Sequence, residues 1–406
     1  MTARDRLLAG LQRRFEKRLW AEQADWYRHE AWHRERKHGA QHPASLSVRE
    51  RRAFALVRSG SLAEAAGEFG AVAEARTATL GAGHHDTLEA REWQGRVLSQ
   101  SHRFTEAEAV WAGVAVMLER LLGSGHPDTL NARQERAAVL YELGRLAEAE
   151  AEYRDIADEW ETALGDLAGA RWARRRQADS LSQLGRSREA EVILLSLVTA
   201  ATERHGANHP ITLACRSGHA LALLWSGRRA EAEAELRAVI PALHSAFGAE
   251  HWDTLAGRAR LAVTLRELGR LDEAEPELAA VTAAMSKLRG PRDRNTFNVR
   301  YHHALALRQQ GRAADAETEL RTVAAGLTAS LGPEHLSVLY ARVWQGVTLH
   351  DLARLDEAAA VLRPAVDRLT GLLGAGHPRV REHRVRLAAL DAARQAGEAG
   401  NGAAPE

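Results

Sequence analysis

The chain of 406 residues has a single cysteine, no long apolar stretch and almost no net charge, and each of these features excludes a class of protein. A single cysteine, Cys215, excludes an intrachain disulfide framework, and a reducing cytoplasm is the expected location. No stretch approaches the roughly 18 uninterrupted apolar residues of a membrane-spanning helix, and we expect no signal peptide before Arg4 and Asp5. The formal net charge is only +1, so no overall field attracts nucleic acid or an anionic membrane.

Lysine and catalytic signatures are also scarce. Lysine occurs only at Lys17, Lys37 and Lys287, and the preference for arginine indicates a GC-rich bacterial genome rather than a function. No Ser-His-Asp set, phosphate-binding loop or Cys-His zinc spacing is present. We therefore expect a protein that is not an enzyme and needs no cofactor.

What the chain has in abundance is one unit repeated about every 42 residues. The best marker of the unit is a turn position, occupied in order by Gly60, His102, Gly144, Gly185, Gly227, Gly269, Gly311 and Ala353. Successive members are 42 residues apart, except for one step of 41 after Gly144. Eleven residues before the turn position every copy has arginine: Arg49, Arg91, Arg133, Arg174, Arg216, Arg258, Arg300 and Arg342. A fixed period of this length is typical of a stacked repeat array.

Each unit has the pattern of a helical hairpin. Apolar residues recur at spacings of three and four on both sides of the turn position, which predicts two amphipathic helices. The turn glycine is suited to the left-handed conformation that ends the first helix. Seven residues before it the side chain is only Ala or Gly, and nine after it the side chain is large and apolar. We expect the small residues to leave space for the large apolar side chains, so that the helices pack closely.

These columns resemble the tetratricopeptide repeat, and the Gly-x-x-His-Pro-x-Thr-Leu start resembles its long kinesin light chain type. The resemblance implies an all-α, right-handed superhelical solenoid of about eight helical hairpins with helical caps. The expected divisions are an N-terminal helical cap over 1–41, with a degenerate repeat as the open alternative, eight repeats over 42–379, a capping helix over 380–396 and a disordered tail over 397–406. One departure is that arginine replaces a tryptophan often found early in the first helix.

The same resemblance implies a concave groove lined by the first helices, which would bind a protein or peptide. The aromatic and arginine residues expected to line it are Trp172, Arg175, Arg176, Arg266, Tyr301, Arg308, Tyr340 and Trp344. Their chemistry suits an acidic segment with apolar anchors. The paired asparagines common at these positions in the kinesin light chain type are missing. The expected function is a non-catalytic scaffold, adaptor or sensor in bacterial signalling, of open oligomeric state.

Two other functions stay open. His29-Glu30-Ala31-Trp32-His33 matches the H-E-x-x-H pattern of zinc hydrolases, although the flanking Arg28 and Arg34 argue for an exposed helix. The run Arg171–Arg176 could bind an anion or nucleic acid, which the balanced charge disfavours. The recurring arginine is expected to be structural, and so is a histidine that recurs at seven helix starts as a hydrogen-bonding group: His42, His84, His126, His209, His251, His335 and His377.

Overall fold

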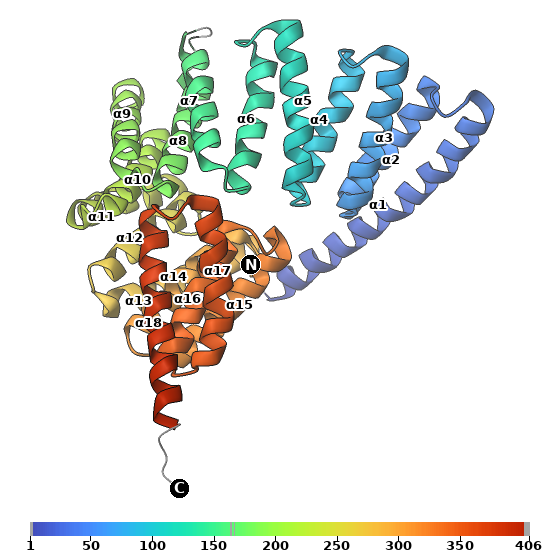
Figure 1. Cartoon of the computed structure of the whole chain (residues 1–406). Helices are drawn as coiled ribbons and strands as arrows, with labels where there is room; N and C mark the ends of the chain where they lie inside the picture. Colours follow the sequence, from blue (N-terminus) through green and yellow to red (C-terminus); the bar gives the residue numbers. More distant parts are fainter. Residues whose placement is uncertain (1–2, 163–164, 166, 402–406) are drawn as a thin grey trace. The chain divides into compact units, whose positions relative to one another are not determined.

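The computed structural model describes residues 3–162, 165 and 167–401, and over these residues the chain forms 18 α-helices and no strand (Figure 1). A long helix, α1 (Ala3–His38), precedes the hairpins and α18 (Pro378–Asn401) follows them. The first helices of the hairpins are α2 (Pro43–Ser59), α4 (His85–Gln100), α6 (Pro127–Glu142), α8 (Leu167–Gln183), α10 (Pro210–Trp225), α12 (Trp252–Glu267), α14 (Arg294–Gln309) and α16 (Leu336–Asp351). The second helices are α3 (Leu62–Leu80), α5 (Phe104–Leu122), α7 (Leu146–Thr162), α9 (Ser187–His205), α11 (Arg229–Phe247), α13 (Leu271–Arg289), α15 (Ala313–Leu331) and α17 (Leu355–Leu373). The predicted all-α solenoid of helical hairpins is confirmed.

The chain folds into two compact units. The N-terminal unit comprises Met1–Leu143 and Asp155–Ala170, and the C-terminal unit comprises Gly144–Arg154 and Arg171–Glu406. The division falls in α7 and early α8, where the repeat is one residue short and lacks the usual His-Pro-Asp-Thr start. At the C-terminal end, α18 continues to Asn401, beyond the predicted helix end at 396. The predicted tail from residue 402 onward lies outside the described residues.

The turn and helix-start columns work as the sequence predicts. Every turn position is left-handed, including the two without glycine, His102 with φ 59° and Ala353 with φ 58°. At the starts of six first helices, a histidine Nδ1 accepts a hydrogen bond from the backbone N–H two residues later. At α14, Asp293 has this role. These six histidines are therefore helix N-caps, because each ring satisfies a backbone donor that the helix leaves unpaired, whereas His377 before α18 makes no such bond.

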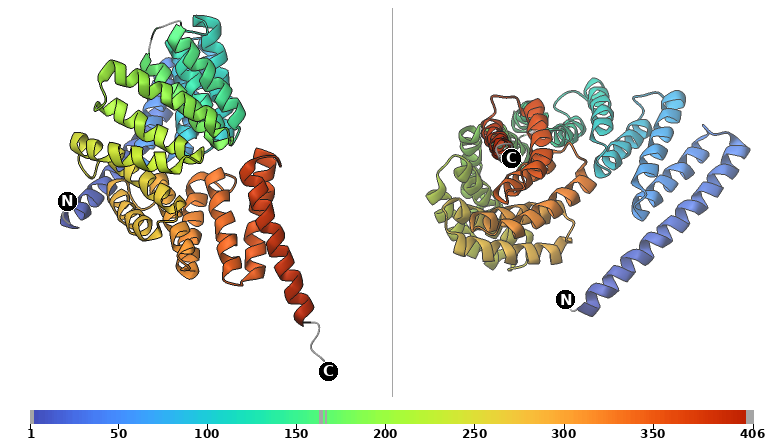
Figure 2. Two further views of the ribbon diagram at one scale, coloured as in Figure 1. Left: turned by 90° about the vertical axis from the view of Figure 1, so that its left-hand side faces the viewer. Right: turned by 60° about the horizontal axis from the view of Figure 1, so that its bottom comes forward.

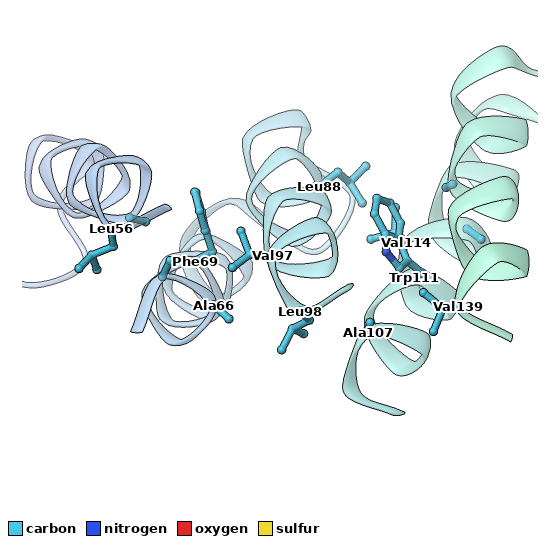
Figure 3. Packing of buried hydrophobic residues seen from close by; sticks show 14 of the residues in the cluster. Leu56, Ala66, Phe69, Leu88, Val97, Leu98, Ala107, Trp111, Val114 and Val139 are labelled. Carbon is cyan, nitrogen blue, oxygen red and sulfur yellow. The ribbon is translucent and has the colours of Figure 1, made fainter. Parts of the chain in front are cut away.

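Small and large side chains meet inside each hairpin. A Cβ added to Gly95 would lie 2.7 Å from the ring of Trp111, and one added to Gly346 would lie 2.7 Å from Cβ of Leu362. Figure 3 shows this packing in the N-terminal unit, where Trp111 and Phe69 lie among buried aliphatic side chains. Since both aromatic rings are at most 1% exposed, the column of large residues forms the core between helices.

In six of the repeats the recurring arginine bonds to another helix in one of two ways, whereas Arg174 donates to Gln177 of its own helix. Four of these arginines pair with a glutamate 19 residues later, in the second helix of the same hairpin: Arg49, Arg216, Arg258 and Arg300. Where valine stands at that place, after Arg91 and Arg342, the arginine instead donates to a threonine 14 residues earlier, in the preceding hairpin. The arginine column thus has the structural role expected from its presence in every repeat.

Within the C-terminal unit, α18 contacts the end of α8. Nε2 of His377 lies 2.9 Å from the carbonyl oxygen of Gln183, and Nη1 of Arg379 donates to Oε1 of Gln183 at 3.2 Å. These residues are 194 and 196 positions apart in the chain. Arg379 also lies 4.3 Å from the ring centroid of Trp225, the last residue of α10. Figure 2 gives two further views of α18 and the hairpins before it.

Candidate binding surface

The predicted groove residues separate into groups. Trp172 and Arg176 of α8 lie against Tyr153 of α7: the Tyr153 and Trp172 ring centroids are 5.6 Å apart, and Arg176 lies 5.6 Å from the Tyr153 ring. Nε of Arg176 also donates to the Tyr153 hydroxyl at 3.4 Å. Tyr153 is fully buried whereas Trp172 is 39% exposed. This group joins the two helices, and the ring of Trp172 remains partly exposed.

Five other predicted residues belong to a second group, which we call the arginine–aromatic cluster. It is built from first helices of consecutive hairpins and from α18, and its members are Arg266, Tyr301, His302, Arg308, Tyr340, Trp344, Arg379, His383 and Arg386. The helical repeat places these side chains on one face because positions three and four apart lie together. The cluster therefore brings residues from three hairpins to the last helix of the chain.

Guanidinium groups cover the aromatic rings of this cluster. Arg386 lies 4.3 Å from the centroid of Trp344, and Arg308 lies 5.4 Å from the same ring. Arg379 lies 5.3 Å from the ring of Tyr340. The ring of His383 packs edge-on against both aromatics, at 6.1 Å from Tyr340 and 6.3 Å from Trp344. In the three arginine contacts the ring face attracts a guanidinium cation, and together with His383 these contacts restrict the orientation of both rings.

Burial governs the protonation of the cluster. Burial raises the pKa of Tyr301, against the opposing charges of Arg266, Arg379 and Arg386, so its hydroxyl stays protonated. Burial, followed by the charges of Arg266 and Arg379, lowers the pKa of His302 to about 3. His383 is similarly lowered to a pKa of about 4, by burial and then by Arg386 and Arg379. Both histidines are consequently neutral near pH 7, and the positive charge is carried by arginines alone.

Carboxylates balance this positive charge only in part. Arg266 pairs with Glu267 at 2.6 Å, Arg308 with Asp351 at 2.5 Å and Arg386 with Glu382 at 2.7 Å. Over the described residues, no carboxylate lies within ion-pair distance of Arg379, whose hydrogen-bond partner is the Gln183 amide. The cluster thus has one more guanidinium than paired carboxylates.

A third group lies on α8, α10 and α12. Arg171 and Arg175 lie near Cys215, and Arg175 lies near Arg260, whose Nη1 donates to Ser217 Oγ at 2.7 Å. Burial and then the charge of Arg175 lower the pKa of Arg260 to about 10. Among the described residues, none of these three arginines has a carboxylate partner. This group therefore also carries positive charge that no carboxylate of the described residues pairs with.

The run Arg171–Arg176 does not form one continuous basic face. Because α8 turns by about 100° per residue, its side chains point to different sides. Ala173 is buried, Arg174 lies near Gln177, and Arg176 packs on Tyr153. Arg175 is exposed. The arrangement gives the anion or nucleic-acid alternative no unified surface.

The predicted zinc residues His29 and His33 lie exposed on α1. Glu30 between them accepts a hydrogen bond from Nε of Arg34 at 2.7 Å, and His33 packs edge-on against Trp32. Over the part of the chain that the structure describes, no group of three or more His, Cys, Asp or Glu side chains could hold a metal ion. Nor is any helix there long and apolar enough to cross a membrane.

A shallow pocket of about 280 Å³ lies in the N-terminal unit, between α3, α4 and α5. Small residues such as Gly67 and Gly70 form much of its wall, with Gln94 beside them. Its one arginine, Arg103, is already paired with Glu106 through two hydrogen bonds of 2.7 Å. The pocket thus lacks both the aromatic rings and the surplus charge of the arginine–aromatic cluster.

Sequence reasoning missed four residues of the cluster. Arg379, His383 and Arg386 lie on α18, which follows the last complete repeat, so the groove columns do not extend to them. His302 does occupy a repeat position expected to line the groove, next to Tyr301, and this position could have identified it from the sequence.

Comparison with known proteins agrees with the repeat structure. Residues 95–128 match the tetratricopeptide repeat family, and no curated protein sequence matches the chain. The fold is similar to that of a Rap protein complexed with competence and sporulation factor, with a TM-score of 0.53, 11% identity, and coverage of 85% of this chain and 99% of that one. It is similar as well to the apo form of the quorum sensor NprR from B. thuringiensis, with a TM-score of 0.52, 14% identity, and coverage of 87% and 97%.

A putative kinesin light chain of Podosopora anserina with nearly identical repeats is 22% identical, with a TM-score of 0.46 over 50% of this chain and 97% of that one. The matched segment includes the turn between α4 and α5, and the same columns recur in all eight hairpins. One segment of the chain thus matches the tetratricopeptide repeat family, and the fold of the chain is that of a helical repeat solenoid. Stacked helical hairpins of this kind form an extended concave surface.

Proposed function

We propose that the chain is a non-catalytic adaptor or sensor that binds a protein or peptide segment in a groove formed by the first helices of the C-terminal unit. The observation that carries this proposal is the arginine–aromatic cluster, in which side chains from three hairpins and α18 converge. Tryptophan, tyrosine and arginine are the residues that contribute most to protein interface energy. Rings held by neighbouring guanidiniums lose little further entropy when a ligand binds.

The ligand that fits best is an acidic segment with apolar anchors. Arg175, Arg260 and Arg379 have no carboxylate partner in the described residues, so a ligand carboxylate would meet an uncompensated charge. The rings of Trp172, 39% exposed, and of Trp344, partly exposed, offer apolar contact area for the anchors.

The similar folds support a role in signalling. The Rap protein is complexed with competence and sporulation factor, and NprR is a quorum sensor. By analogy of fold we propose a signalling or regulatory role for this chain also. The single cysteine supports a cytoplasmic location.

A peptide-display selection on the purified full chain tests the proposal, followed by surface plasmon resonance with the selected peptides. We expect acidic peptides with aromatic or aliphatic residues to be enriched. Trp344→Ala should speed dissociation by roughly tenfold to thirtyfold if this ring is an anchor. Arg175→Glu should slow association, and more strongly at low salt, because exposed charges act by steering.

Matched controls come from surfaces outside the proposed groove. Trp26, 58% exposed on α1, is the control for tryptophan, and Arg321, 60% exposed on α15, is the control for arginine. Trp26→Ala and Arg321→Glu should leave binding unchanged. Peptides that bind all groove variants normally but lose binding with a control variant would overturn the groove assignment.

A further inference from the structure

The arginine–aromatic cluster contains buried hydrogen-bonding atoms that have no partner. They are Nε of Arg266, the hydroxyl of Tyr340, Nδ1 of His302 and Nε2 of His383. Arg266 is 7% exposed and His383 is 3% exposed. Leaving a buried polar atom without a hydrogen bond costs about 1–3 kcal/mol, and native proteins rarely leave several in one place.

At least three of these atoms can act only or mainly as donors. Nε of an arginine always carries a hydrogen, and the protonated Tyr340 hydroxyl can donate. In His383, Nδ1 lies 3.1 Å from Nη1 of Arg386, which is always a donor. Nδ1 must then accept, so the proton of the neutral ring is on Nε2. The missing partner of this group is accordingly an acceptor.

The surrounding charge points to an acceptor that is negative. The charges of Arg266, Arg379 and Arg386 all act on the Tyr301 hydroxyl, which itself makes no hydrogen bond to the described residues. Arg379 has no carboxylate partner, and like charges gathered in a partly buried place repel unless an anion joins them. A neutral acceptor such as an amide oxygen would satisfy the donors and leave this repulsion unchanged.

We propose that these donors bind a compact oxyanion, a carboxylate or a phosphate, carried by the peptide ligand. The four residues that would hold it, which we call the oxyanion site, are Arg266, Tyr340, Arg379 and His383. The identity of the carrier rests on the proposed function, whereas the site itself can be tested with free anions. Two of the four residues lie on α18, so the site is complete only with α18 held against α8 and α10 by the contacts of Arg379 with Gln183 and Trp225.

The first measurement uses inorganic phosphate and acetate as probes. Melting temperature of the full chain is recorded at increasing concentrations of each anion, with chloride replacing it at constant ionic strength. We expect phosphate to raise the melting temperature saturably, since binding to the folded state alone stabilises it. Arg379→Gln and Tyr340→Phe should each weaken the apparent affinity by about tenfold or more, the effect of one hydrogen bond to a charged group.

Tyr340→Phe separates binding from folding. It removes only an oxygen that has no partner, so without anion the variant should melt at or above the wild-type temperature. Arg321→Gln is the control for lost positive charge and should keep the wild-type response. Equal anion responses in wild type, Arg379→Gln and Tyr340→Phe would overturn the oxyanion site, as would loss of the response in Arg321→Gln alone.

The selected peptides then distinguish the carriers and the two proposals. Each peptide is compared with versions in which a glutamate is changed to glutamine, the C-terminus is amidated, or a glutamate is replaced by phosphoserine. The bound group is the one whose change alters the peptide's affinity for wild type but not its affinity for Arg379→Gln. Peptides that need Trp344 but ignore Arg379 and Tyr340 would overturn the oxyanion site alone. A phosphate response with no selectable peptide would support the site and contradict the proposed function.

Discussion

Arg258 joins the two helices of its hairpin through a two-pronged ion pair with Glu277. Its Nε–H donates to Oε1 at 2.6 Å and its Nη2–H to Oε2 at 3.0 Å. Both side chains are about 70% buried, so solvent screens the pair less than it screens the ion pairs at the turns. The same geometry recurs between Arg216 and Glu235.

Arg258→Ala should lower the free energy of unfolding by roughly 1–3 kcal/mol, because Glu277 loses its partner and the arginine stem no longer packs. Urea unfolding followed by circular dichroism measures this. The exposed Arg237 on α11 is the control, and Arg237→Ala should change stability by less than about 0.5 kcal/mol. An unchanged midpoint for Arg258→Ala, with peptide binding lost instead, would reverse the structural assignment.

Gly346→Ala should destabilise the C-terminal unit by roughly 1–3 kcal/mol. The new Cβ would lie 2.7 Å from Cβ of Leu362 and 3.1 Å from its backbone, which a side-chain rotation cannot relieve. Gly113 is exposed within α5 and has no atom within 4 Å of an added Cβ. Gly113→Ala should therefore raise stability by about 0.5–1 kcal/mol, and thermal melts of both variants check the contrast.

Ala353→Gly should raise stability by about 1 kcal/mol, since Ala353 is held at φ 58°, where a Cβ is strained. The comparison variant is Ala360→Gly, at an exposed position inside α17, which should lower stability by a similar amount. Opposite shifts of the two urea midpoints are expected. Destabilisation by both changes would show that the turn is not strained.

His303 should make stability depend on pH. Burial lowers its pKa, but the hydrogen bonds and charges of Glu319 at 2.7 Å and Glu275 at 3.2 Å outweigh burial, and the pKa is raised above 6.5. A raised histidine pKa means that the stabilisation is complete below pH 6.5 and is lost as pH rises through the folded-state pKa. The stability difference between wild type and His303→Gln should thus shrink as the pH rises above 6.5.

His219 gives the opposite trend and serves as the control. Burial lowers its pKa, against the charges of Glu191 and Glu235, so its contribution is lost as pH falls below 6.5. Urea titrations of His219→Gln and His303→Gln over the same pH range check both signs. A constant difference for His303→Gln across the range would contradict the proposed charge pairing.

Metal analysis of the purified, tag-free chain should find far less than one zinc per chain. His29 and His33 are exposed, and Glu30, which would have to serve as the base, already pairs with Arg34. Stoichiometric zinc that disappears in His29→Ala and His33→Ala would instead support the hydrolase alternative.

The sequence by itself determined the hairpins. Glycine at most turn positions, histidine before six of the first helices, and the small and large columns act within one repeat or between neighbours, and their spacing alone specifies these contacts. It did not specify the partner of the recurring arginine, because that partner changes from glutamate to threonine when the position 19 residues later becomes valine.

Only the tertiary structure decided which groove residues meet. Twist accumulates from hairpin to hairpin, so the place where α18 contacts α8, nearly 200 residues earlier, depends on the sum of many small rotations and not on the period. That contact brings Arg379, His383 and Arg386 to Tyr340 and Trp344, while Arg176 packs on Tyr153 instead. The surplus of buried donors in the cluster arises from this long-range contact, because each donor taken separately belongs to an ordinary helix face.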